Sequence, residues 1–202
     1  MKELRRLLID QRRLKGIGLT DSVIDLMIDE IHYLRRVLRL RNGDPINVVD
    51  GEGNLWEAFL NTSNSIKLKT SFEKPLIRQI APKKKICLAV VIPKQGFDEV
   101  LRMGCEIGVD VFQPLTSEYQ VHKGNNHSRC NRWNAILKEA VEQSERLWMP
   151  ELRFNLELQE WLNQKLDHTI AIATTRRKES IDLQSWVKNL AEEEREIWIL
   201  IG

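Results

Sequence analysis

Apolar residues follow two different patterns along the chain, and the change falls near Ala81. The part before it holds short apolar runs separated by turn residues, at 46–49, 55–60 and 66–72. Short runs with turns between them are typical of a small antiparallel barrel. The part after it holds continuous apolar runs at 86–92, 109–114 and 197–201. These runs and the helical spacing between them favour parallel strands joined by helices, so the sequence predicts an α/β protein.

The segment 97–107 has helical spacing and joins two of the continuous runs. We expect a βαβ unit here, because parallel strands need a crossover of this length. Such sheets bind ligands beyond the carboxyl ends of their strands, where Lys94 follows the first run, so Lys94 is a candidate phosphate contact. A second amphipathic helix is expected over 132–148. Before it, the polar segment 118–132 is expected to form a loop.

Basic residues gather in the first third of the chain. The opening segment contains Arg5 and Arg6 in a local positive patch, which would attract nucleic-acid phosphates whatever the base sequence. The alternative is a basic surface that is only solvated and binds nothing. Helical spacing over 29–41 places Arg35 and Arg39 four residues apart, with Arg36 beside them. Like charges at this spacing repel, so an anion is expected to compensate them. His32 in the same segment could be a base, but a single histidine near a helix start is more often structural.

Composition narrows the class of protein. The chain has 202 residues and a net charge of +2, so the distribution of charge says more than its sum. Its three cysteines are an odd number at unrelated spacings, which suits free thiols in a reducing cytoplasm. No apolar run is long enough to span a bilayer. His122, His127 and Cys130 match no zinc spacing, so we expect no metal.

Proline and lysine cluster between 73 and 85, where the hydrophobic periodicity stops. Such a change of composition is typical of a linker between domains. We therefore expect two domains, 1–80 and 81–202.

Several short motifs occur in a fixed order: Lys94, Glu106-Ile107-Gly108-Val109, Pro114, Ser117-Glu118, Arg132-Trp133, Glu142-Gln143-Ser144, Arg146 and Pro150. In this order they resemble the RsmE family, bacterial enzymes that make N3-methyluridine in 16S ribosomal RNA. The resemblance covers nearly the whole chain. It implies an amino-terminal PUA-like barrel that binds RNA and a carboxy-terminal SPOUT domain, a knotted α/β fold that binds S-adenosylmethionine and forms a homodimer.

The resemblance also implies roles for individual residues. The RNA-binding set is Arg5, Arg6, His32, Arg35, Arg36, Arg39 and Lys94. The cofactor-binding set is Thr174, Thr175, Ile201 and Gly202. Further positions match family motifs near the cofactor and dimer region: Glu106, Glu142, Gln143 and Arg146. Without the resemblance, Glu142 and Arg146 would be read as an ion pair on a solvated helix face.

In the family, the last apolar run continues into a Gly-Pro-Glu-Gly-Gly loop and a knotted segment, of which only Ile201 and Gly202 are present here. Our main hypothesis is methylation of uridine N3, which requires the imide proton to leave and the uracil oxygens to be stabilised. No residue is named as the general base. One alternative is an RNA-binding dimer that has no catalytic activity because the cofactor loop is missing. A weaker one is a PUA-like adaptor whose second domain only mediates self-association.

Overall fold

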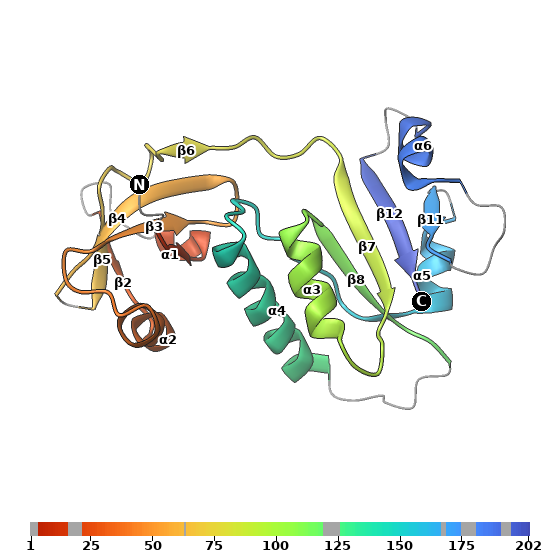
Figure 1. Cartoon of the computed structure of the whole chain (residues 1–202), viewed down its shortest axis with the longest axis horizontal. Helices are drawn as coiled ribbons and strands as arrows, with labels where there is room; N and C mark the ends of the chain where they lie inside the picture. Colours follow the sequence, from red (N-terminus) through yellow and green to blue (C-terminus); the bar gives the residue numbers. More distant parts are fainter. Residues whose placement is uncertain are drawn as a thin grey trace. The chain divides into compact units, whose positions relative to one another are not determined.

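The structure, a computed structural model, describes residues 4–15, 22–62, 64–118, 126–166, 169–174, 181–190 and 195–202. The chain divides into two compact units (Figure 1). The first unit comprises Met1–Ala81 and Val141–Met149, and the second comprises Pro82–Ala140 and Pro150–Gly202. The return of Val141–Met149 to the first unit is not predicted by the sequence patterns.

The first unit is built on a mixed sheet with the strand order β1-β3-β4-β5-β2, in which β6 pairs with β4. The strands are β1 Arg6–Leu8, β2 Val23–Asp25, β3 Pro45–Val49, β4 Asn54–Leu60, β5 Ser65–Leu68 and β6 Ile77–Arg78. β1 runs parallel to β3, and the other described pairs are antiparallel. The three apolar runs expected to form antiparallel strands are confirmed as β3, β4 and β5. β1 adds a parallel pair to them, which the long connection from β1 to β3 allows.

Among the described residues, three short helical segments join these strands: α1 Gln11–Lys15, α2 Ile28–His32 and η1 Tyr33–Val37, the last of them a π-helix. The helix predicted over 29–41 therefore ends at Val37, because Arg39 adopts the left-handed conformation with φ 56°. Leu34 of η1 is fully buried in the core of the unit, together with Ile46 of β3 and Trp56 of β4.

The second unit is built on an all-parallel sheet with the order β10-β8-β7-β12-β11, in which β9 pairs with β8. The strands are β7 Lys85–Val91, β8 Val111–Thr116, β9 Glu151–Leu152, β10 Leu156–Glu157, β11 Ile170–Ile172 and β12 Glu196–Ile201. The helices are α3 Phe97–Glu106, α4 Asn126–Gln143, α5 Leu158–Gln164 and α6 Leu183–Lys188. The predicted βαβ unit is confirmed as β7-α3-β8, and the last apolar run is confirmed as strand β12, which lies between β7 and β11.

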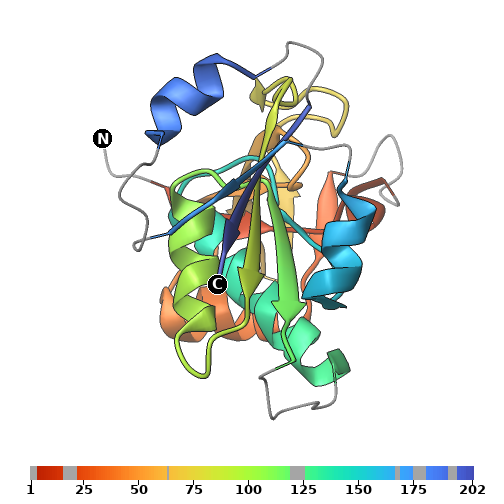
Figure 2. The same ribbon diagram turned by 90° about the vertical axis from the view of Figure 1, so that its right-hand side faces the viewer.

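Helices cover both faces of this sheet, with α3 and α5 on opposite sides (Figure 2). Successive residues of a strand point to opposite faces, so the two cores alternate along each strand. Cys87 and Ala89 of β7 pack in one cluster with Trp161 of α5. On the other face, Phe112 of β8 lies against α3 at Gly104, where an added Cβ would come within 2.7 Å of the ring. Gly104 therefore sets how closely α3 packs on the sheet.

Helix α4 differs from its prediction at both ends. It begins at Asn126, so the expected loop over 118–132 is wrong from that residue onward, and it ends at Gln143 instead of Trp148. Glu145 then adopts a left-handed conformation with φ 61°, which prevents the helix from continuing. Two backbone hydrogen bonds fasten the segment that follows to the β3–β4 turn: Gly53 N to Leu147 O and Met149 N to Gly51 O, at 2.9 and 2.8 Å.

Candidate functional site

Three of the residues predicted to bind the cofactor lie at the carboxyl ends of neighbouring parallel strands. The N–H of Ala173 donates to the carbonyl of Leu200 at 2.9 Å. Thr174 therefore follows β11 beside Ile201, which ends β12, and Gly202. All three are exposed, with 41% of Ile201 accessible. Thr175, the fourth predicted residue, lies outside the described residues.

Gly202 allows the end of β12 to lie close to β7. A Cβ added at this position would lie 3.0 Å from Cγ2 of Val91, tighter than an ordinary van der Waals contact. A larger residue would require Val91 or the strand end to move. The carboxyl edge of the sheet thus combines a close backbone approach with the exposed apolar side chain of Ile201.

Lys94 lies three residues beyond the end of β7 and is exposed at the same edge. The helix that follows, α3, begins with two acidic residues, Asp98 and Glu99. Asp98 forms an ion pair with Arg132, and Glu99 forms one with Arg102. Negative side chains in the first turn already interact with the positive end of the helix dipole. Lys94 is therefore a better candidate for a phosphate contact here than the α3 amino terminus.

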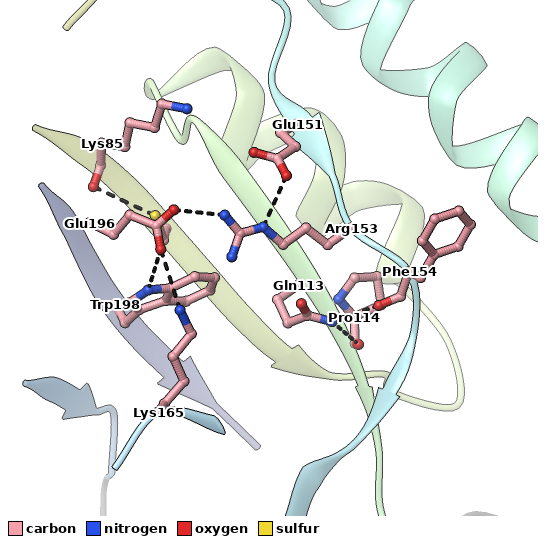
Figure 3. A network of polar contacts seen from close by, with 10 residues as sticks. Lys85, Gln113, Pro114, Glu151, Arg153, Phe154, Lys165, Glu196 and Trp198 are labelled. Carbon is pink, nitrogen blue, oxygen red and sulfur yellow. Dashed lines mark hydrogen bonds and ion pairs between the residues drawn. The ribbon is translucent and has the colours of Figure 1, made fainter. Parts of the chain in front are cut away.

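A network of charged side chains lies at the opposite, amino-terminal end of the strands (Figure 3). The carboxylate of Glu196 accepts hydrogen bonds from Arg153 at 2.7 Å, from the Trp198 indole at 3.0 Å and from Lys165 at 3.4 Å. Arg153 also donates to Glu151 at 3.0 Å. Both cations lie over the Trp198 ring, 5.2 and 4.5 Å from its centroid. The network therefore pairs its own charges, which is the arrangement of a structural ion cluster.

Two pKa shifts support this reading. Burial alone would raise the pKa of Glu196, but the hydrogen bond and charge of Arg153, with Lys165 and Trp198, outweigh it and lower the pKa below its ordinary value. Burial, followed by the charge of Glu196, raises the pKa of the neighbouring Cys87 thiol to about 12. Cys87 therefore stays protonated at neutral pH and is a poor nucleophile or base.

The predicted RNA-binding residues of the first unit divide into two groups. Arg6 has a mostly buried side chain that pairs with Glu145, and its guanidinium also donates to the Glu145 carbonyl. Arg35 donates to the side chain of Asn42 at 2.8 Å and to the carbonyl of Asn61 at 2.9 Å. Both arginines therefore form internal contacts, and Arg35 is held apart from Arg36 and Arg39, with which the helical spacing grouped it.

The other predicted residues of this unit, Arg5, His32, Arg36 and Arg39, are exposed. Arg41, which we did not single out in the sequence, is exposed as well. The sequence indicated only that Arg41 lies in the basic segment 29–41. Because the helix ends at Val37, Arg41 lies with Arg39 in the turn that follows it.

The remaining family-motif positions lie on two helices. Glu106 ends α3 and is exposed, and Gly108 follows it with φ 103°, the left-handed conformation common just after a helix. Glu142 and Gln143 are the last residues of α4, which ends before Arg146. The carboxylate of Glu142 accepts a hydrogen bond from the backbone N–H of Leu8 at 2.9 Å. Glu142 therefore helps to attach β1 to the segment that returns to the first unit.

The described residues show neither a metal-binding group nor a membrane-spanning helix. They contain no group of three or more histidine, cysteine or acidic residues arranged to hold a metal ion. His122 lies outside them. Among the helices that the structure describes, none combines the length and apolar character needed to cross a bilayer.

Comparison with known families gives two matches. Residues 81–202 match the model of the RNA methyltransferase domain, and residues 29–72 match that of the RNA methyltransferase PUA domain. The chain is 34% identical over 176 residues to ribosomal RNA small subunit methyltransferase E of Synechocystis sp., an alignment that covers 83% of this chain. The chain spans only about half of that relative's length, 55%. These matches confirm the RsmE resemblance.

Solved structures show the same fold. A ribosomal RNA small subunit methyltransferase E from Neisseria gonorrhoeae, bound to S-adenosyl methionine, aligns with a TM-score of 0.74 and 21% identity, covering 99% of this chain and 80% of its own. A putative methyltransferase from Legionella pneumophila, in complex with the same cofactor, aligns with a TM-score of 0.79 and 18% identity, with the same coverage. The PUA-like and parallel SPOUT-type fold predicted from the sequence is thereby confirmed.

Proposed function

Because this chain belongs to the RNA methyltransferase family, we propose that it transfers a methyl group from S-adenosylmethionine to N3 of a uridine in 16S ribosomal RNA. The relatives from Synechocystis and Neisseria are both named as ribosomal RNA methyltransferases, which supports a ribosomal RNA substrate. The first unit would bind the RNA, and the second, over most of 81–202, would bind the cofactor.

The observation that carries the proposal is the meeting of Thr174, Ile201 and Gly202 at the carboxyl edge of the parallel sheet. Parallel α/β sheets bind nucleotide-like ligands at this edge. The chemistry of the three residues fits the cofactor: the exposed Ile201 side chain offers an apolar surface for the adenine ring, Thr174 offers a hydroxyl, and Gly202 offers unobstructed backbone groups. Thr175 would extend this set.

When bound, S-adenosylmethionine supplies a methyl group on a positively charged sulfur. The protein's own part is to hold the uridine so that N3 lies in line for transfer, and to stabilise the negative charge on the uracil oxygens as the N3 proton leaves. A paired base would first have to leave its helix. Lys94 lies at the same edge as the cofactor residues, and we assign it a phosphate of the substrate strand, which would fix the nucleotide beside it.

The chain's partners follow from the same proposal. Substrate RNA would contact the exposed residues Arg5, His32, Arg36 and Arg39. We expect the reaction to take place in the cytoplasm, because ribosomal subunits are found there.

We also propose a homodimer formed by the second unit. Support comes from large apolar side chains that are exposed in its last part, Ile172, Ile181, Leu183 and Val187, because a partner protomer could cover them. Light scattering tests this directly, and a monomer would contradict it.

Titration calorimetry with S-adenosylmethionine tests the cofactor edge. The wild-type chain should bind, and Ile201→Glu should weaken binding by about tenfold or more, because it places a charge against the adenine surface. Leu166→Glu is the matched control: Leu166 is 80% exposed just beyond α5, next to Lys165 at the amino-terminal end of the strands, and this variant should bind as the wild type does. Absence of cofactor binding by the wild-type chain, with RNA binding retained, would overturn the proposal in favour of the non-catalytic RNA-binding alternative.

A further inference from the structure

The turn at the end of η1, residues 36–41, has an unusual backbone, and we call it the cap turn. The N–H of Leu38 donates to Tyr33 O, and the N–H of Leu40 donates to Leu34 O, both at 2.9 Å. The first bond is the last bond of the π-helix, and the second spans Arg39 as the outer hydrogen bond of a Schellman cap does, widened by one residue. Between the two leucines, Arg39 has φ 56°, the left-handed conformation that such caps require.

Arginine is an unfavourable residue for this position. Glycine and, less often, asparagine occupy the left-handed position of helix caps, because a Cβ there crowds the backbone. The two hydrogen bonds and the packing of Leu38 and Leu40 against the core of the first unit hold the backbone in place in spite of this cost. A residue kept in a strained conformation by its surroundings is a candidate for a functional role.

The packing also determines the direction of the arginines. Leu38 and Leu40 pack inward, whereas Arg39 and Arg41, which alternate with them, are exposed, as is Arg36. In the part of the chain that the structure describes, none of these three arginines has an acidic side chain within ion-pair distance. The one carboxylate in the turn region, that of Asp44, accepts the backbone N–H of Arg41 at 2.7 Å. The outer surface of the cap turn is therefore positively charged.

Arg35 fixes the position of this surface. Its guanidinium joins Asn42, just beyond the cap turn, to the carbonyl of Asn61 at the end of β4. The N–H of Gly43 donates to Leu60 O at 2.7 Å and attaches the same segment to β4. The cap turn is thus held at both its ends, and its arginines extend from a fixed backbone.

We propose that the cap turn is a phosphate-binding turn for RNA, in which Arg36, Arg39 and Arg41 contact backbone phosphates and Arg35 is a positioning residue. This proposal rests on the proposed function, because it takes RNA to be the substrate. It adds Arg41 to the residues that contact RNA, and it gives Arg35 a positioning role instead of a direct contact. Because guanidinium groups recognise phosphate without reading bases, this surface provides affinity and register, and the choice of uridine is made elsewhere.

The left-handed conformation of Arg39 gives a test in which stability and binding change in opposite directions. Arg39→Gly should raise the midpoint of thermal unfolding by about 2–4 °C, because glycine relieves the strain. It should also weaken binding of a 16S ribosomal RNA transcript by about tenfold at low salt, and reduce the slope of log affinity against log salt by about one. Arg39→Lys keeps the charge and should retain most of the affinity.

The matched control is Arg12→Gln, which removes one positive charge from the same unit at a side chain that is 94% exposed. It should change the slope by much less than Arg39→Gly. Equal losses for the two variants, or unchanged RNA affinity in the stabilised Arg39→Gly variant, would overturn the cap turn as a binding site while leaving the methyltransferase proposal intact. Failure of the wild-type chain to bind the transcript would instead overturn the proposed function itself.

Discussion

The two units use arginine in opposite ways. In the second unit, Arg153 lies between Glu151 and Glu196 and over the Trp198 ring, so its charge is neutralised within the fold. In the cap turn of the first unit, Arg39 is exposed and occupies a backbone conformation that suits glycine better. The role of an arginine therefore depends on its neighbours. An arginine paired with carboxylates stabilises the fold, whereas one without an acidic neighbour is available to a ligand.

The largest effect is expected from breaking the neutralised cluster. Glu196→Gln leaves Arg153 and Lys165 without their shared carboxylate, and Glu196 is only 24% exposed. The variant should lose about 2–3 kcal/mol of the free energy of unfolding, because hydrogen bonds to a charged, mostly buried group are lost. Urea unfolding measures this loss. The exposed Glu106→Gln is the control and should change stability little; equal stability of the Glu196→Gln variant and the wild type would show that the cluster is not structural.

Acid should remove this same contribution from the wild-type protein. The folded-state pKa of Glu196 is lowered, so its stabilisation is fully present above its ordinary value of 4.5 and is lost as pH falls through the lowered value. The stability difference between wild type and Glu196→Gln should therefore be constant from neutral pH to about pH 5 and disappear under more acidic conditions. A difference that grew on acidification would contradict the assignment of the shift.

Arg35 lies between these two cases, because it belongs to the basic segment of the first unit yet donates hydrogen bonds to groups within the fold. Arg35→Met should cost about 1 kcal/mol of stability through its two lost hydrogen bonds. It should also weaken RNA binding, because the cap turn loses its attachment to Asn61. Arg36→Met is the matched control: it should weaken RNA binding without changing the unfolding midpoint. If Arg35→Met reduced affinity at unchanged stability, Arg35 would be a direct contact and not a positioning residue.

The smallest effect concerns the thiols. Cys87 and Cys105 are buried and Cys130 is partly accessible, and burial raises the pKa of Cys87 to about 12. Iodoacetamide at neutral pH should therefore label Cys130 first, with little change in stability. Mass spectrometry of tryptic peptides identifies the labelled residue. Labelling of Cys87 in the folded protein would mean that the network beside it opens readily.

Much of the fold could be predicted because the relevant signals are local. The apolar run at 197–201 identified a parallel strand, and the helical spacing over 97–107 identified α3. The errors have non-local causes. The end of α4 at Gln143, five residues before the predicted end, depends on the attachment of Leu147 and Met149 to a distant turn. The parallel pairing of β1 with β3, which no sequence pattern indicated, likewise depends on a long connection.

The candidate site was harder to predict, because a sequence shows charges but not their partners. The spacing of Arg35 and Arg39 suggested one continuous basic face, yet Arg35 bonds to Asn42 and Asn61 while Arg39 leaves the helix at a left-handed turn. The network of Glu196, Arg153 and Lys165 gave no signal, since its members are far apart in the chain and meet only when the sheet forms.

The most direct test of the account is methyl transfer to RNA. The chain is incubated with S-adenosylmethionine carrying a labelled methyl group and 16S ribosomal RNA that lacks the modification, and the RNA is digested and analysed by nucleoside mass spectrometry. The account predicts that the label appears in N3-methyluridine, and that the Ile201→Glu variant gives much less product than Leu166→Glu. RNA and cofactor that both bind to the wild-type chain, with no label entering uridine, would contradict it.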